Sequence, residues 1–227
     1  MRLRHKPDND SDGNIFWITM TDLMTGLVLV FVVMFFYTYL NSHQGKMAES
    51  IAQENTTKAI QEAFVKQNID ASIDPVSGVV KISDLELFEL NSYKLSEKGK
   101  KYLDKFAPAY FNSIFSEKYM YENLDKIIIQ GHTDSQTYIG KFTKDEQYMK
   151  NMELSLNRAY EVANYMTNTQ YNKENGDKLR KMIIVEGASF ANPVIINGKE
   201  DFAKSRRVEL KLVMKKQKDK QPITSQQ

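Results

Sequence analysis

One carboxylate stands inside an apolar block near the start of the chain. Asp22 is the only acidic or basic residue within Ile15–Leu40. An ionised carboxylate is costly in hydrocarbon, so such residues usually face a protein partner or a water-filled path, where they relay ions. Thr21 and Thr25 offer hydroxyl oxygens nearby, and Gly26, one helical turn after the carboxylate, would let a partner helix approach closely. This pattern predicts an ion-binding site for H⁺ or Na⁺ at Asp22, with Thr21 and Thr25 as candidate helpers.

An ordinary explanation also exists for Asp22. The uncharged run Leu23–Leu40 would be ~27 Å long as a helix, close to the thickness of the hydrocarbon core of a bilayer. If the span begins at Leu23, Asp22 is a polar residue at the membrane interface and has no role in ion flow. Its position alone leaves both interpretations open.

A second candidate site lies in the distal half of the chain. Asp134 follows the apolar run Lys126–Gln130, and Arg158 lies near the start of an amphipathic segment, Asn151–Thr169. A carboxylate at a strand end and a guanidinium at a helix start can meet in one cleft. Together they suit a zwitterionic ligand, because arginine binds a carboxylate with two hydrogen bonds and aspartate accepts from an ammonium group. The alternative, that the two side chains only pair with each other, stays open at this point.

The apolar block has the features of a single transmembrane helix over residues 15–40. Trp17 lies near one end and tyrosines lie near the other, as in the aromatic belts of membrane proteins. Residues 41–44 offer no small-residue cleavage site, which argues against a removable signal peptide. The arm of residues 1–14 carries three Lys or Arg residues. The positive-inside rule therefore places the N-terminus in the cytoplasm and the distal domain on the other side of the membrane.

Residues 76–216 have the pattern of an α+β domain with the order β-α-β-α-β-β. Helices on one face of a small mixed sheet are the expected architecture. Ser96 is the expected N-cap of the first helix. The strands are expected at Val79–Ile82, Lys126–Gln130, Met182–Val185 and Arg207–Met214, the last as an edge or hairpin strand. The helices are expected at Ser96–Phe115 and Asn151–Thr169.

Residues 41–75 are polar and would link the two parts of the chain. Apolar residues three, four or eight apart within residues 45–67 fit a short amphipathic helix that packs on its own copy in a dimer. A flexible tether fits the composition equally well. Residues 217–227 are expected to form a flexible tail.

The composition excludes several classes of site. The chain has no cysteine, which excludes a thiol nucleophile, a disulfide framework and a cysteine-based zinc site. Lys and Arg total 31 against 29 Asp and Glu, with no basic stripe, so nucleic-acid binding has no support. His43 and His132 lack ligand-spaced companions, and we expect no metal site. Nothing resembles a nucleotide-binding loop, so we expect no enzymatic activity and no cofactor beyond the transported ion.

The sequence around Asp22 resembles the single helix of MotB-type stator proteins. The matching residues are Trp17–Leu27 (WITMTDLMTGL), followed by Val30 and Phe31. In that family a tryptophan precedes the ion-carrying aspartate by a few residues, and an apolar run with methionine and phenylalanine follows it. The resemblance implies that Asp22 binds the proton or sodium ion.

Several distal motifs are similar, in the same order, to those of OmpA-like peptidoglycan-binding domains. The spacing of Phe88–Leu103 fits the first strand–helix junction of that family, and Ser205 stands where the family usually has Asn or Asp. The motifs that match most closely are Gly131–Asp134 (GHTD), Asn151–Ala159 (NMELSLNRA) and Ser205–Leu210 (SRRVEL).

In that family the domain binds the diaminopimelate of peptidoglycan stem peptides. The resemblance therefore implies peptidoglycan-binding roles for Asp134 and Arg158, with Arg206 and Asn91 as helpers. The loop 135–150 is longer than is usual in the family and could cover or reshape the cleft.

An ion-binding helix joined to a peptidoglycan clamp is the architecture of a stator unit. The resemblance implies a homodimer of this chain inside a pentameric ring of a separate multi-span partner similar to MotA or ZorA. The chain looks most like the ZorB subunits of Zorya anti-phage systems. The features that resemble them are the short N-terminal arm, Thr21 before Asp22, and the run Asp-Leu-Met-x-Gly-Leu that begins at Asp22. A flagellar MotB-type stator and a passive peptidoglycan tether without ion flow remain as alternatives.

Overall fold

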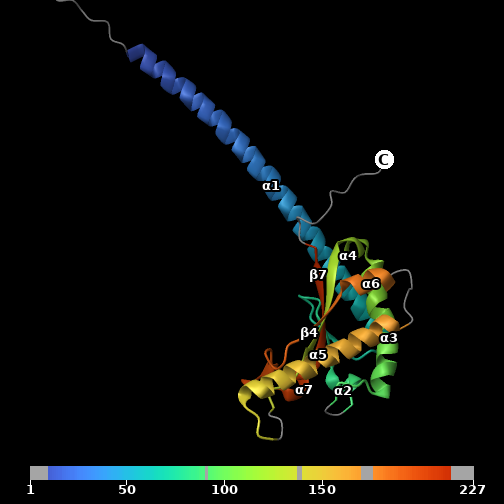
Figure 1. Cartoon of the computed structure of the whole chain (residues 1–227). Helices are drawn as coiled ribbons and strands as arrows, with labels where there is room; N and C mark the ends of the chain where they lie inside the picture. Colours follow the sequence, from blue (N-terminus) through green and yellow to red (C-terminus); the bar gives the residue numbers. More distant parts are fainter. Residues whose placement is uncertain (1–9, 90–91, 137–139, 170–175, 216–227) are drawn as a thin grey trace, which may run out of the picture. The chain divides into compact units, whose positions relative to one another are not determined.

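The computed structural model describes most of the 227-residue chain. The chain divides into two units, residues 1–48 and 49–227, and each unit is described by itself. Helix α1 (Asp10–Gln67) begins in the first unit and ends in the second (Figure 1). The described residues are 10–89, 92–136, 140–169 and 176–215.

The described residues of the first unit form the beginning of helix α1. Its segment Phe16–Leu40 contains 25 residues with a mean hydropathy of 2.2. All side chains of this segment are exposed. Among the described residues, this is the one helix that is long and apolar enough to cross a membrane, by length and composition. It coincides with the transmembrane helix predicted from the sequence.

The second unit is built on a mixed five-stranded sheet with the order β1-β2-β7-β3-β4. Strands β3 and β4 are parallel, and the other neighbours in the sheet are antiparallel. Strands β5 and β6 form a separate hairpin. The strands are β1 Ser72–Ile73, β2 Val80–Ser83, β3 Leu124–His132, β4 Ile183–Gly187, β5 Ile195–Ile196, β6 Lys199–Glu200 and β7 Arg207–Met214. The helices of this unit, apart from the end of α1, are α2 Asp84–Leu87, α3 Glu97–Ser116, α4 Lys118–Asn123, α5 Lys144–Asn168, α6 Gly176–Met182 and α7 Phe202–Ser205.

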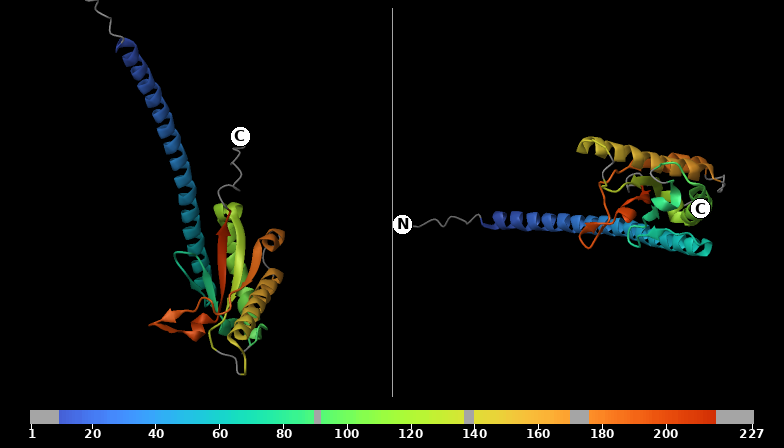
Figure 2. Two further views of the ribbon diagram at one scale, coloured as in Figure 1. Left: turned by 60° about the vertical axis from the view of Figure 1, so that its left-hand side comes forward. Right: turned by 90° about the horizontal axis from the view of Figure 1, so that it is seen from below.

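Alternating side chains give the sheet one apolar face and one polar face. On β3, Ile127 and Ile129 are fully buried, whereas Ile128 and Gln130 lie on the opposite face and are partly exposed. The register pairs Ile129 with Leu210 of β7, so apolar side chains of neighbouring strands align. Helices α3 and α5 lie against the sheet (Figure 2). Residues of both helices join these strands in one hydrophobic core. The predicted fold class is confirmed: a single apolar helix and an α+β domain with helices on one face of a small mixed sheet.

The end of helix α1 belongs to the hydrophobic core of the second unit. Ile60 and Phe64 are almost completely buried. The ring of Phe64 lies 5.0 Å from the ring of Phe106 on α3, measured between centroids. The sequence left residues 45–67 open between a dimer helix and a flexible tether. In the structure, residues 49–67 are helical, and Ala52, Ile60 and Phe64 pack on the domain of the same chain.

Local capping sets the starts of the two long helices of the domain. Ser96 caps α3, as predicted, and its side chain accepts a backbone hydrogen bond from the first turn of the helix. Helix α5 begins at Lys144, about two turns before the predicted start at Asn151. The reason is a capping box formed by Thr143 and Glu146. The short elements β1, α2, α4, α6, β5, β6 and α7 were not predicted, because so few residues show no periodicity.

Phe64→Ala should test whether the end of α1 is part of the domain core. Removal of a buried ring of this size costs about 3–5 kcal/mol of unfolding free energy. Val65→Ala is the matched control, because Val65 is the next residue of the helix and is 78% exposed. Urea unfolding of residues 49–227 measures both effects. Equal losses in the two variants would show that the helix end does not take part in the cooperative core.

Candidate functional site

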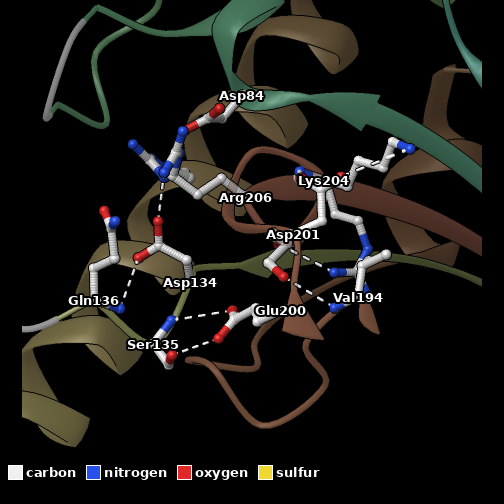
Figure 3. A network of polar contacts seen from close by, with 12 residues as sticks. Asp84, Asp134, Ser135, Gln136, Val194, Glu200, Asp201, Lys204 and Arg206 are labelled. Atoms are coloured by element: carbon white, nitrogen blue, oxygen red, sulfur yellow. Dashed lines mark hydrogen bonds and ion pairs between the residues drawn. The ribbon is translucent and has the colours of Figure 1, made fainter. Parts of the chain in front are cut away.

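Sheet topology brings the candidate site together at one end of three neighbouring strands. Strand β7 lies between β2 and β3, so the expected edge position of this strand is wrong. Its first residue, Arg207, is paired with Ser83 on one side and His132 on the other. The residues just beyond these strand ends therefore converge. They are Asp84 after β2, Asp134 in the loop after β3, and Arg206 immediately before β7 (Figure 3).

Four charged side chains of alternating sign form a connected network at this point. Arg158 Nη1 lies 3.3 Å from Asp84 Oδ2. Arg206 Nε lies 3.4 Å from the same oxygen, and Arg206 Nη1 donates a hydrogen bond to Asp134 Oδ2 (Figure 3). Two carboxylates and two guanidinium groups give the network no net formal charge. Arg206 is its most accessible member, with 28% of its side chain exposed.

Arg158 is held in place from several directions and is only 4% exposed. Its Nε donates to the carbonyl of Ser92 at 3.1 Å, and its guanidinium lies 5.2 Å from the ring centre of Phe88. Helix α5 approaches β3 closely at Gly131, where a β-carbon would lie 2.0 Å from the carbonyl oxygen of Ser155. Only glycine permits this approach, which brings the helix segment carrying Arg158 next to the end of β3.

The structure brings three of the four predicted peptidoglycan-binding residues into one network. Asp134 is bonded directly to Arg206, and Arg158 joins them through Asp84. The fourth predicted residue, Asn91, lies outside the described residues. The role of these side chains in ligand binding stays a prediction.

Asp84 was missed by sequence reasoning, although it links both arginines. It is 6% exposed. Burial raises the pKa of its carboxyl above the usual value, and this outweighs the lowering by the guanidinium groups of Arg158 and Arg206. The available signal was a single acidic residue placed directly after the short buried strand Val80–Ser83. That signal is weak without knowledge of which strand lies beside it.

The loop after β3 is attached to the β5–β6 hairpin. The backbone amide of Ser135 donates to Glu200 Oε1 at 3.2 Å, and the Ser135 hydroxyl donates to the other carboxylate oxygen (Figure 3). The amide of Gln136 donates to Asp134 Oδ1 at 3.2 Å. These bonds fix the Asp134 carboxylate between the loop and Arg206.

Comparison with known proteins identifies the domain. The model of the OmpA family matches residues 87–207, which include Asp134, Arg158 and Arg206. The chain belongs to the OmpA family. A Zorya protein ZorB of Escherichia coli (Crooks strain) is 33% identical over 218 residues, which cover 91% of this chain and 91% of that protein. A ZorB from a second Escherichia coli strain is 25% identical and covers 95% of this chain and 87% of its own length.

A solved structure shows the same fold. The MotB-like protein of Desulfovibrio vulgaris matches with a TM-score of 0.50 and 20% sequence identity, covering 72% of this chain and 91% of that chain. The resemblance to OmpA-like domains and to ZorB that the sequence motifs indicated is confirmed.

A second charged network of the OmpA-family domain lies on the polar face of its sheet. Glu209 Oε1 accepts from Arg207 Nε at 2.7 Å, and Glu209 Oε2 lies 3.0 Å from Lys211 Nζ and 3.5 Å from His132 Nε2. Burial raises the pKa of Glu209, but the neighbouring side chains of His132, Lys211 and Arg207 outweigh it and hold the pKa well below its usual range. Burial lowers the pKa of His132, against the raising effect of the neighbouring Glu209 carboxylate. This network fixes the strand that begins at Arg207, next to the site.

The predicted ion-binding residue lies in helix α1, with an exposed side chain. Thr21 Oγ1 donates to the carbonyl of Trp17 at 2.7 Å, and Thr25 Oγ1 donates to the carbonyl of Thr21 at 2.7 Å. Each hydroxyl thereby satisfies its proton inside the helix and keeps an acceptor oxygen. A β-carbon at Gly26 would meet no atom of the described residues within 4 Å, so this side of the helix is open. Ion binding at Asp22 with these helpers stays a prediction.

Metal ligation has no support in the part of the chain that the structure describes. No three His, Asp or Glu side chains of those residues are grouped so that they could hold a metal ion. His132 instead lies beside Glu209, as described above.

Glu209→Gln should destabilise the domain by about 3 kcal/mol near pH 7, because it leaves the buried charge of Arg207 without its partner. A carboxyl with a lowered pKa contributes stability above its unfolded pKa of about 4.3, and this contribution is lost as the pH falls through the folded pKa. The deficit of the variant should therefore be complete at pH 7 and shrink below about pH 4. Thermal unfolding at several pH values measures it. Glu153→Gln, an exposed change on α5, is the control, and a pH-independent deficit would contradict the assignment.

Proposed function

We propose that this chain is an ion-conducting stator subunit of a rotary motor in the bacterial inner membrane. The transported ion is H⁺ or Na⁺, the anchor is peptidoglycan, and the motor serves anti-phage defence in the manner of a Zorya system. The observation that carries the proposal is similarity to ZorB along most of the chain, at 33% identity over 91% of both proteins. That similarity includes both the apolar helix with its single carboxylate and the OmpA-family domain.

The membrane helix supplies the ion-coupling step. Asp22 takes up H⁺ or Na⁺ and loses its net charge, which changes how favourably it contacts a partner helix or hydrocarbon. The hydroxyl oxygens of Thr21 and Thr25 assist by coordinating the ion. Successive loading and release turn a pentameric ring of a MotA- or ZorA-like partner around a homodimer of this chain. No covalent chemistry takes part.

The OmpA-family domain supplies the anchor that keeps the dimer from rotating with the ring. Diaminopimelate in a peptidoglycan stem carries an ammonium and a carboxylate, which match the mixed charges of the site. Asp134 accepts from the ammonium group, Arg158 and Arg206 bind the carboxylate, and Asn91 assists. The support for this assignment is the neutral network of paired charges that opens to solvent at Arg206.

The proposed topology is that of a single-pass inner-membrane protein. Residues 1–14 are the cytoplasmic arm and residues 15–40 cross the membrane. On the periplasmic side, residues 41–48 form the linker. The peptidoglycan-binding domain is residues 76–216 together with the packed end of α1 and β1 within residues 49–75, and residues 217–227 are the tail. The support is the apolar segment Phe16–Leu40 on the same chain as an OmpA-family domain.

Asp22→Asn should abolish protection against phage when it is compared with wild type at equal membrane levels. The amide keeps the shape of the side chain but cannot take up or release an ion at the membrane. Plating of phage on cells that carry the native gene neighbourhood measures protection. Thr38→Val is the matched control on the same helix, because the Thr38 hydroxyl donates to the carbonyl of Met34 within that helix.

Each outcome of the plating experiment decides between named functions. Equal protection by wild type and Asp22→Asn would contradict the proposal of an ion-driven motor and favour the passive tether. If wild type gives no protection, the defence assignment fails, and swimming of a stator-deleted strain then tests the flagellar alternative.

Asp134→Asn should weaken binding of the full chain, in detergent micelles, to purified peptidoglycan sacculi by about ten- to a hundredfold. The expected loss is that of a hydrogen bond to a charged group, about 1.5–3 kcal/mol. Asp104→Asn is the matched control, because Asp104 is exposed and bonds to Tyr165 rather than to the site. Co-sedimentation measures both. Equal binding by Asp134→Asn and wild type would remove Asp134 from the ligand site.

A further inference from the structure

The carboxylate of Asp84 is shared between the two arginines of the site. A single oxygen, Oδ2, lies 3.3 Å from Arg158 Nη1 and 3.4 Å from Arg206 Nε. The backbone makes a further link, since the amide of Asp84 donates to the carbonyl of Arg206 at 3.2 Å. Asp84 is therefore ion-paired with Arg206 through its side chain and hydrogen-bonded to it through its main chain, and it is almost fully buried.

Arg206 stands between two competing carboxylates. One is Asp84, and the other is Asp134, which accepts a hydrogen bond from Arg206 Nη1. A guanidinium that is shared in this way neutralises Asp134 only in part. Asp134 then keeps the capacity to accept hydrogen bonds from a positively charged group of a ligand.

The net charge of the site also depends on Asp84. With Asp84 ionised, the network of Asp84, Asp134, Arg158 and Arg206 is neutral. Without it, two guanidinium groups face one carboxylate, and the site has a net charge of plus one. In a partly dehydrated site such a charge favours a purely anionic ligand over one that also carries an ammonium group.

We propose that Asp84 is a positioning residue that determines the specificity of the site. By holding Arg206 away from full pairing with Asp134, it makes the site select a ligand residue with both an ammonium and a carboxylate over a residue with a carboxylate alone. The inference rests on the proposed function, because it takes the side chain of diaminopimelate as the ligand. Asp84 acts through its two arginines and does not itself need to touch the ligand.

Two synthetic stem peptides test the inference directly. They are identical except at the third residue, which is diaminopimelate in one and 2-aminopimelate in the other, so that only the side-chain ammonium is lost. Calorimetric titration of the full chain in detergent micelles gives the two affinities and their ratio. Wild type should prefer the diaminopimelate peptide by about tenfold or more, as expected for a hydrogen bond to a charged group.

Asp84→Asn should lower this preference towards one and leave binding of the 2-aminopimelate peptide intact or stronger. The amide keeps the volume of the side chain, and a melting curve checks that the domain is folded. Asp104→Asn, which lies outside the site, should keep the wild-type ratio. A merely structural role of Asp84 would weaken binding of both peptides alike and would leave the ratio unchanged.

Arg206→Gln provides a second test with the opposite sign, and it does not require Asp84→Asn to fold. Removal of the shared guanidinium frees Asp134 and gives the site a net charge of minus one. The preference for the diaminopimelate peptide should rise above that of wild type, although both peptides bind more weakly. A shift of the ratio in the same direction in both variants would overturn the inference.

The remaining outcomes separate this inference from the function on which it rests. If wild type binds neither peptide, the proposed peptidoglycan anchor fails, and the inference fails with it. If wild type binds both peptides equally, or if Asp84→Asn keeps the wild-type ratio within about twofold, only the specificity role of Asp84 is lost.

Discussion

The pairing of β7 with β2 on one side and β3 on the other is the constraint on which the site depends. Arg207 lies opposite both Ser83 and His132, so the ends of two strands and the start of a third meet at one place. Because side chains alternate along a strand, a shift of one residue would move Val208 and Leu210 out of the core and Glu209 into it. The apolar core of the domain therefore also fixes the position of Arg206.

Two charged networks meet at the start of β7 and differ in how completely their charged side chains are paired. Around Glu209, a hydrogen bond from Arg207 and the nearby side chains of Lys211 and His132 surround a carboxylate whose pKa is held low, and this network stabilises the sheet. At the other network, Arg206 is shared between two carboxylates and is partly exposed. Buried charges must be paired in either case. The second network differs from the first in combining two carboxylates with two guanidinium groups, and these balanced charges suit a zwitterionic ligand.

The two units of the chain suit different solvents, and the polar groups of each unit find their hydrogen-bond or ion-pair partners in different ways. In the first, Phe16–Leu40 exposes apolar side chains in every direction, and the threonine hydroxyls donate to carbonyls of their own helix. An ionised Asp22 cannot do the same, because a carboxylate has no proton to donate, and this is the physical reason to propose a transported ion as its partner. In the second unit, charged side chains pair with one another, as around Asp84. A ligand of the site must therefore compete with these pairs.

The sequence by itself determined whatever depends on local pattern. Neighbouring residues are enough to predict the length of the apolar helix, the alternation of β7 and the Ser96 cap. They also give the order of the motifs that carry Asp134, Arg158 and Arg206. Tertiary structure alone revealed Asp84 as the link between the two arginines, because that link depends on which strands lie side by side. It also decided that Phe64 at the end of α1 packs against Phe106, since a helical pattern shows that one face is apolar but not which surface covers it.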